Sequence, residues 1–259
     1  QVIAPAEHDT ASAVVAVPAE EEDYAYLSCG TWSLLGVETD QPVLSPAAME
    51  GSLTNEGGAG GKIRLLKNIM GLWLLQQSRR RWQLEGENYS YAELTELAEQ
   101  APAFSSLIDP DAPEFLNPPS MPDAICQFCR ETGQYVPQSK GEISRTILES
   151  LALKYRWTMD RLREVTGMKL GVLHMVGGGI QNKLLCQFAA NACGVKVVAG
   201  PVEATAIGNL MVQAMALGEV DGLAQAREIV AASFPPAVYL PQDQSAWEKQ
   251  YQRFLTLLK

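Results

Sequence analysis

The sequence has little of three features that would each indicate a class of protein. No apolar run approaches the roughly 18 residues that a membrane-spanning helix needs, so we expect no contact with a membrane. Only two histidines are present, which excludes a multi-histidine metal centre. The formal net charge is -10, and the one basic cluster, residues 79–81, is too short for a nucleic-acid binder. An anion such as ATP would therefore have to be held by local backbone N–H groups.

Cysteines are also few. Five is an odd number in a chain of 259 residues, which disfavours a disulfide framework and favours a reducing, cytoplasmic setting. Cys126 and Cys129 form a single C-x-x-C pair, whereas a structural zinc site would need a second such pair. We interpret these two residues as ordinary thiols on a helix.

The chain begins without an initiator methionine. Small, apolar and polar residues alternate through residues 1–20, which end in an acidic run. We expect residues 1–20 to connect to a preceding domain and residues 21–240 to form the main domain. Residues 241–259 are expected to be a terminal amphipathic helix, whose apolar face would be exposed if it packs on that preceding domain.

Hydrophobic patterns predict an α/β fold in which strands alternate with helices. The predicted strands are 24–28, 32–37, 169–176 and 196–199. The predicted helices are 62–82, 91–100, 142–165, 181–192, 203–217 and 247–259. Six prolines between residues 101 and 124 predict a loop there.

Glycine-containing turns are the first candidates for an anion site. Gly30 and Thr31 form a predicted hairpin turn whose N–H groups and hydroxyl could contact a phosphate, although plain hairpin turns of this kind are common. The glycine-rich segment 51–61 is followed by lysine, as in a P-loop. However, Glu56 stands where a P-loop needs glycine and Ile63 where it needs Ser or Thr, so we reject a P-loop.

A second glycine turn, residues 177–179, lies between a predicted strand and a predicted helix. Backbone N–H groups at such a position can receive a phosphate. A dinucleotide-binding fingerprint would need glycine where Asn182 stands, so the match to this motif is imperfect. A dinucleotide site stays open as a hypothesis, in which Glu203 would bind the ribose. Close packing of the strand on the helix would explain the three glycines equally well.

Polar side chains near these turns could supply chemistry. Asp9 could accept a proton from a sugar hydroxyl during phosphoryl transfer, or it could simply cap a helix. Arg64 and Asn68 share one face of the predicted helix 62–82, where they could line a cleft or face solvent. His174 sits in an apolar strand, and we interpret it as a core residue.

Five segments, taken in order, resemble the C-terminal half of the FGGY carbohydrate kinases. They are HDTASAV, CGTWSLLGVE, TNEGGAGGKIRLLKNIMGLWLLQ, FLNPPSMPDAI and HMVGGGIQNKLLCQFAANACGVKVVAGPVEATAIGN. The match runs from about residue 5 to residue 220 and is nearest to the branch that phosphorylates L-rhamnulose. This resemblance implies an actin-like (ribonuclease H-like) α/β fold with a mixed sheet flanked by helices. It also implies ATP and Mg²⁺ as cofactors and L-rhamnulose 1-phosphate as the product.

The resemblance further implies roles for seven residues. Asp9 is similar to the catalytic base of the family. The residues that match its sugar side are His8, Thr10 and Asn68, and those that match its ATP side are Thr31, Gln76 and Gly178. The other half of such a kinase would supply most of the sugar pocket and the acidic group that places Mg²⁺, so this chain alone is expected to be inactive.

Three other functions stay open from the sequence. The first is a kinase for another ketose or polyol of the same family. The second is an NAD-dependent oxidoreductase built on the turn at residues 177–179. The third is a sugar or nucleotide sensor with the actin-like fold and no catalytic activity.

Overall fold

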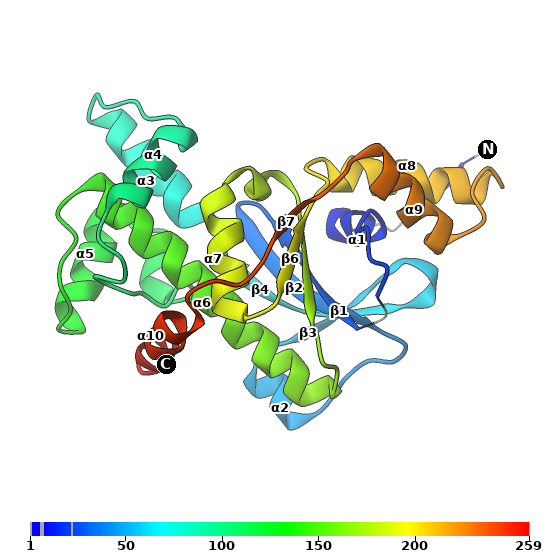
Figure 1. Cartoon of the computed structure of the whole chain (residues 1–259), viewed down its shortest axis with the longest axis horizontal. Coiled ribbons are helices and arrows are strands. Elements are labelled where there is room, and N and C mark those ends of the chain that lie inside the picture. Colours follow the sequence, from blue (N-terminus) through cyan, green and yellow to red (C-terminus); the bar gives the residue numbers. More distant parts are fainter. Residues whose placement is uncertain (1, 6–7, 22, 259) are drawn as a thin grey trace.

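A seven-stranded mixed sheet organises the chain (Figure 1). The computed structural model describes residues 2–5, 8–21 and 23–258, so residues 1, 6 and 7 of the expected connection lie outside it. The strand order is β3-β4-β2-β1-β5-β6-β7. The strands are β1 (Tyr24–Cys29), β2 (Trp32–Thr39), β3 (Thr54–Gly57), β4 (Ile63–Met70), β5 (Val172–Val176), β6 (Lys196–Ala199) and β7 (Ala237–Tyr239). Of the neighbouring pairs, β1–β5 and β5–β6 are parallel and the other four are antiparallel, which confirms the expected mixed sheet.

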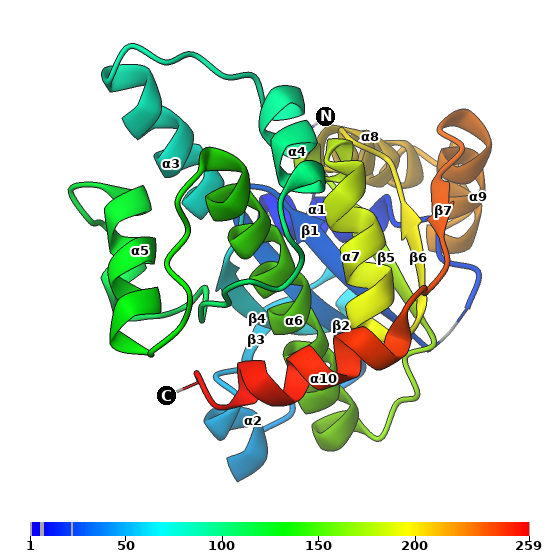
Figure 2. The same cartoon turned by 60° about the vertical axis from the view of Figure 1, so that its left-hand side comes forward.

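Helices flank the sheet on both faces. They are α1 (Asp9–Val15), α2 (Pro46–Glu50), α3 (Trp73–Leu84), α4 (Tyr91–Gln100), α5 (Met121–Glu131), α6 (Lys140–Thr166), α7 (Lys183–Cys193), α8 (Ala204–Ala216), α9 (Leu223–Ser233) and α10 (Gln244–Leu255). Figures 1 and 2 show α6 and α7 on one face and α1, α8 and α9 on the other. In the described part of the chain, no helix is both long and apolar enough to cross a bilayer.

Alternation along β1 divides the core into two. Ala25, Leu27 and Cys29 face α6 and α7 in the larger cluster, whereas Tyr24 and Tyr26 face α1 in the smaller one. This follows from the period of two along a strand, which sends successive side chains to opposite faces. Both faces of the sheet are therefore covered, and its central strands carry apolar residues on both sides.

The predicted helix 62–82 is wrong over its first half. Residues Ile63–Met70 form β4, which pairs with both β2 and β3, and only Trp73–Leu84 is helical. A strand buried on both faces has a nearly continuous apolar run, which periodicity cannot distinguish from a buried helix. Gly71 lies between the strand and the helix, and a larger residue would not fit there, because a Cβ would lie 2.5 Å from the Oγ of Ser33.

Several short elements were not expected from the sequence: α1, α2, α9, β3 and β7. Apart from α9, which has eleven residues, each is too short to carry a strong periodic pattern of its own. The predicted loop 101–124 ends early, since α5 begins at Met121 with Pro122 in its first turn, where proline is tolerated. Cys126 and Cys129 lie on this helix, and all five cysteines of the described chain are free thiols.

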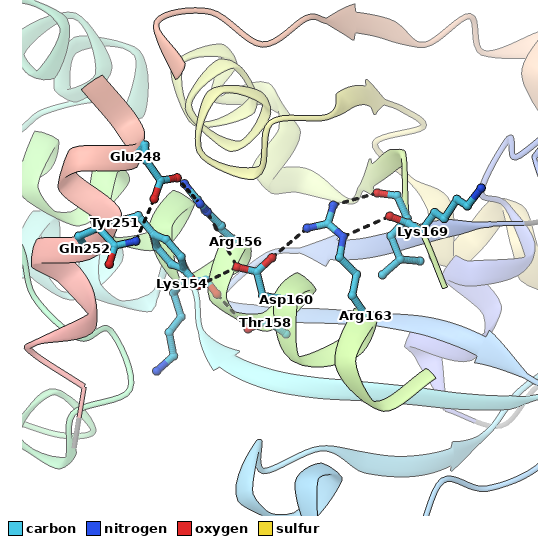
Figure 3. A network of polar contacts seen from close by, with 10 residues as sticks. Lys154, Arg156, Thr158, Asp160, Arg163, Lys169, Glu248, Tyr251 and Gln252 are labelled. Carbon is cyan, nitrogen blue, oxygen red and sulfur yellow. Dashed lines mark hydrogen bonds and ion pairs between the residues drawn. The ribbon is translucent and has the colours of Figure 1, made fainter. Parts of the chain in front are cut away.

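The terminal helix α10 belongs to the main core. Its apolar side chains Trp247, Tyr251 and Phe254 are buried against α6 and α7, so the expected exposed face is not found. Figure 3 shows polar contacts between α10 and α6. Glu248 lies 2.5 Å from Nη2 of Arg156, and Tyr251 donates a hydrogen bond to Asp160 at 2.8 Å.

Two neighbouring residues test this placement of α10. We expect Phe254→Ala to lower the free energy of unfolding by about 3–5 kcal/mol, because the ring is fully buried. The matched control Leu255→Ala, on the exposed side, should cost about 1 kcal/mol or less. Urea unfolding of the two variants measures both values, and equal losses would mean that α10 is not seated in this core.

His174 is a buried member of β5, as the sequence predicts. Its ring lies edge-on to Tyr24, and Nε2 is 3.4 Å from a carboxylate oxygen of Glu21. Burial lowers the pKa of His174 to about 4, despite the opposing effect of the Glu21 carboxylate. The folded protein therefore keeps this imidazole neutral over a range in which an unfolded histidine is protonated.

The pH dependence of stability should report this shift. Between about pH 4 and pH 6.5 the unfolded state binds the proton and the native state does not, so stability rises with pH in this window. We expect His174 to account for about 3 kcal/mol of that rise. Urea unfolding of His174→Gln at several pH values should give a free energy of unfolding that changes less with pH between these limits. A slope equal to that of the unmodified protein would contradict the lowered pKa of His174.

Candidate functional site

Three loops meet at the carboxyl edge of the parallel strands. The Gly30–Thr31 turn follows β1, the turn at residues 177–179 follows β5, and residues 200–203 follow β6. Parallel strands bring their carboxyl ends to one edge of a sheet, and ligands of open α/β sheets bind outside that edge. This edge is therefore the candidate site.

The glycines after β5 allow very close packing on the end of β1. A Cβ at Gly179 would lie 2.4 Å from Sγ of Cys29, and one at Gly177 would lie 2.9 Å from the Cys29 carbonyl oxygen. Gly177 also has φ +90°, which disfavours other residues. At Gly178, by contrast, a Cβ would meet nothing within 4 Å. The outer two glycines thus pack on the strand, while the middle one faces open space.

Backbone hydrogen bonds hold the Gly30–Thr31 turn against the start of α3. The amide of Leu72 donates to the Gly30 carbonyl at 3.1 Å, and the amide of Trp73 donates to the Thr31 carbonyl at 3.0 Å. The next turn of α3 then brings Gln76 beside this hairpin. A segment expected to be one long helix is instead a strand and a helix joined at the site.

Two adjoining clefts open at this edge. The first has a volume of about 840 Å³ and lies between the two glycine turns, the start of α3 and the outer face of α4. The second has a volume of about 650 Å³ and lies beside the start of α1. Gly30, Thr31 and Gly178 line both clefts, so the two turns form the boundary between them.

All seven predicted site residues line these clefts. Thr31, Gln76 and Gly178 line the larger one. His8, Asp9, Thr10 and Asn68 line the smaller one, together with Thr31 and Gly178. Asn68 reaches it from β4, where it stands opposite Leu34 of β2 rather than on a helix. Arg64, four residues before Asn68, does not line either cleft and is fully buried.

Among the described residues, the contacts of the Asp9 carboxylate all involve one of its oxygens, Oδ1. Oδ1 accepts hydrogen bonds from the amide of Thr10 at 2.7 Å and from its hydroxyl at 3.3 Å. The Nδ1 atom of His8 is also 3.5 Å from Oδ1. The Asp9 side chain is 76% exposed, so its carboxylate is accessible from the cleft.

Helix α1, which begins at Asp9, is held close to α8 by a glycine. A Cβ at Gly208 would lie 1.8 Å from the carbonyl oxygen of Ser12, so any larger residue would force the two helices apart. Ala13 and Val14 of α1 belong to the same buried cluster as Tyr24 and Tyr26 of the sheet. The position of Asp9 therefore depends on this close helix–helix contact.

The C-terminal domain model of the FGGY family of carbohydrate kinases matches residues 25–217. The chain belongs to this family. Among curated proteins, this FGGY kinase domain is 52% identical over 253 residues to a protein named rhamnulokinase of Bacteroides thetaiotaomicron, and 48% identical over 256 residues to one of Pectobacterium carotovorum. These alignments cover 98% and 99% of this chain but 51% of each relative, so the chain spans about half the length of the proteins it matches.

Solved structures agree on the fold of this FGGY domain. A xylulose kinase from Rhodospirillum rubrum matches 96% of the chain, and 49% of its own length, with a TM-score of 0.72 and 18% identity. Plasmodium falciparum glycerol kinase with ADP matches the same shares with a TM-score of 0.67 and 18% identity. The expected actin-like fold is thereby confirmed.

The oxidoreductase alternative is wrong. Asn182, which stands where the dinucleotide fingerprint needs its third glycine, instead caps α7, because its side-chain oxygen accepts a hydrogen bond from the amide of Leu185.

Sequence reasoning missed one wall of the larger cleft. Tyr91, Thr95 and Glu96 of α4 line it on the side opposite the glycine turn. Asn182 crosses from that turn and donates to the Thr95 hydroxyl at 3.2 Å. The spacing of i, i+4 and i+5 places these three side chains on one helix face, and this spacing can be read from the sequence. The local sequence does not show, however, that this face lines a cleft.

Metal-ligating side chains are sparse in the FGGY domain. Within residues 2–5, 8–21 and 23–258, no group of three or more His, Cys, Asp or Glu side chains is arranged to hold an ion. The carboxylates that line the smaller cleft are Asp9, at the start of α1, and Glu203, just before α8. Mg²⁺ is commonly held by one or two carboxylates together with substrate phosphates, which is compatible with such a pair.

The glycine turn gives a matched stability test. We expect Gly179→Ala to lower the free energy of unfolding by about 1–3 kcal/mol, because its Cβ would overlap Cys29. Gly178→Ala should change it by no more than about 1 kcal/mol, and it can even stabilise, since the position is open and has no positive φ. Urea unfolding of both variants checks the difference, and equal effects would contradict the packing described here.

Proposed function

We propose that this chain is the C-terminal half of a kinase that transfers the γ-phosphoryl group of ATP to L-rhamnulose, giving L-rhamnulose 1-phosphate. The choice of sugar rests on one observation: relatives named rhamnulokinase are 46–52% identical along nearly the whole chain. In this proposal residues 1–20 connect to the other half, residues 21–240 form the kinase domain, and residues 241–259 form its terminal helix. The chain alone would be inactive, because the sugar pocket is only partly built here.

Asp9 would act as the general base on the acceptor hydroxyl. Phosphoryl transfer needs positioning and charge stabilisation more than covalent chemistry, and a carboxylate within reach of the attacking hydroxyl can take its proton. The contacts described above all involve Oδ1, so Oδ2 is the oxygen we assign to this proton. His8, Thr10 and Asn68, which line the same cleft, would bind the other hydroxyls of the sugar.

ATP would lie in the larger cleft with its phosphates at the boundary between the two clefts. Thr31 would contact the phosphates through its hydroxyl and backbone, since turns of this kind present donors to anions. Gly178, where no side chain blocks the approach, and Gln76 of α3 would contact the nucleotide. This arrangement directs the γ-phosphoryl group toward Asp9 across the Gly30–Thr31 turn.

Mg²⁺ would bind at this site together with ATP, as MgATP. Its chemistry when bound is to neutralise charge on the transferred phosphoryl group. Glu203, which lines the same cleft as Asp9, would be the carboxylate of this chain available to the ion, and we expect the remaining ligands in the other half of the protein. Five free thiols favour a reducing, cytoplasmic setting.

The decisive experiment uses the full-length protein that carries this chain. Release of ADP is measured with MgATP and a panel of acceptors: L-rhamnulose, L-fuculose, D-xylulose and glycerol. We expect turnover to favour L-rhamnulose strongly. Asp9→Asn should lower kcat by about 10²–10⁴-fold, because only the base is lost, while calorimetry should show that ATP and sugar still bind.

The other outcomes separate the alternatives. Turnover that favours another ketose or a polyol would keep the kinase chemistry and overturn the choice of L-rhamnulose. Binding of ATP without turnover on any sugar would indicate a non-catalytic sensor. An Asp9→Asn variant with normal kcat would show that another group accepts the proton.

A further inference from the structure

A row of charged residues crosses the sheet beneath α1. Arg64 of β4 stands between Glu38 of β2 and Glu56 of β3, each of which is its direct cross-strand partner. The Arg64 side chain is fully buried, which is rare for a guanidinium unless it is paired. The row starts under α9 and ends at the edge of the sheet next to the start of α1.

Each carboxylate in this row has its own cation. Glu38 accepts hydrogen bonds from Arg227 of α9 at 2.7 Å and from the hydroxyl of Tyr24 at 2.5 Å. Arg64 therefore turns to the other side of the row. Its Nη2 donates to Glu56 at 2.8 Å, and its Nε donates to the Gly57 carbonyl at 3.0 Å. Arg64 thus fixes both the side chain and the backbone of the β3 edge.

The carboxylate that Arg64 holds lies beside a residue of the smaller cleft. Oε2 of Glu56 is 3.9 Å from Nδ1 of His8, and Oδ1 of Asp9 is 3.5 Å from the same nitrogen. Glu56 itself does not line the cleft, whereas His8 does. Two carboxylates next to Nδ1 favour a proton on that nitrogen, since carboxylates only accept. The opposite ring nitrogen, Nε2, is then left for the cleft.

The Arg64–Glu56 pair is a costly way to stabilise a sheet. Replacing a buried ion pair with well-packed apolar side chains is often neutral or stabilising. The guanidinium also lies close to the buried hydroxyl of Tyr26, and among the described residues neither that hydroxyl nor Nη1 of Arg64 makes a hydrogen bond of ordinary geometry. Stability alone does not explain such a cluster, whereas orientation of a neighbouring functional group does.

We propose that Glu56, held by Arg64, is a positioning residue that orients His8 and keeps its proton on Nδ1, so that Nε2 receives a hydroxyl of the acceptor sugar. This inference rests on the proposed function, in which His8 binds that sugar. It adds Glu56 and Arg64 as determinants of sugar binding that lie outside the cleft. ATP binding, on the far side of the Gly30–Thr31 turn, should be independent of them.

The test compares two neutralised carboxylates in the full-length protein. Glu56→Gln keeps the shape of the side chain and removes its charge. We expect a roughly tenfold rise in KM for the ketose, with KM for MgATP unchanged within about twofold, because the negative charge 3.9 Å from Nδ1 of His8 is lost. The matched control is Asp40→Asn, which neutralises the exposed partner of Lys62 near the same edge of the sheet and should leave both KM values unchanged.

A double-mutant cycle shows whether Glu56 acts through His8. In a His8→Gln background, Glu56→Gln should add little further loss, because the group that it orients is gone. Additive losses, equal effects on both KM values, or kinetics like those of Asp40→Asn would each overturn the inference. Absence of turnover in the unmodified protein would instead reject the proposed function, so the two failures are distinguishable.

Discussion

The contact between the end of β1 and the glycine turn after β5 is the constraint on which the site depends. Parallel neighbours in a sheet lie about 4.8 Å apart, so the loops that leave them compete for the same space. Gly177 and Gly179 remove that competition, because neither places a Cβ against Cys29. The chain can then cross directly over the strand end, and Gly178 is left at the boundary between the two clefts.

The larger cleft has walls that belong to the main core. One side is the Gly30–Thr31 turn, to which the first amides of α3 donate, and another is α4, which packs on the buried helix α6. α4 and α6 each begin at a capping box, at Ser90 and Ser139 respectively. This side of the site is therefore built before any ligand arrives, which is what the binding of a flexible phosphate chain benefits from.

The smaller cleft has a different foundation. Its wall is the seven-residue helix α1, which is held by the close approach at Gly208 and by apolar packing on Tyr24 and Tyr26. Below it runs the charged row from Arg227 to Glu56, which ties α9 to β2 and β4 to β3. Packing against α8 and the charges at the sheet edge thus both help to position the two residues at the start of α1, His8 and Asp9.

Local signals in the sequence were enough to predict the elements that have strong turn residues or a long periodic pattern. The hairpin around Gly30, the long helix α6 and the strand that carries His174 were each expected close to their observed limits, because strong turn residues or a long periodic run defined them. The family resemblance selected the seven site residues, and these lie together in the fold. No single motif among them would have been sufficient.

Tertiary structure decided what local patterns cannot encode. Residues 63–70 became a strand because β2 and β3 pair with it on both sides, and α10 became part of the core because α6 and α7 cover its apolar face. Arg64 shows the same limit most clearly. Its sequence neighbours suggested a polar helix face, but pairing across three strands buries it beside Glu56 and links it to His8. The sequence by itself determined most of the helices and strands and the chemical groups that they carry. Which of these elements face one another depended on pairing between residues far apart in the chain, and such pairing leaves no periodic pattern in the local sequence.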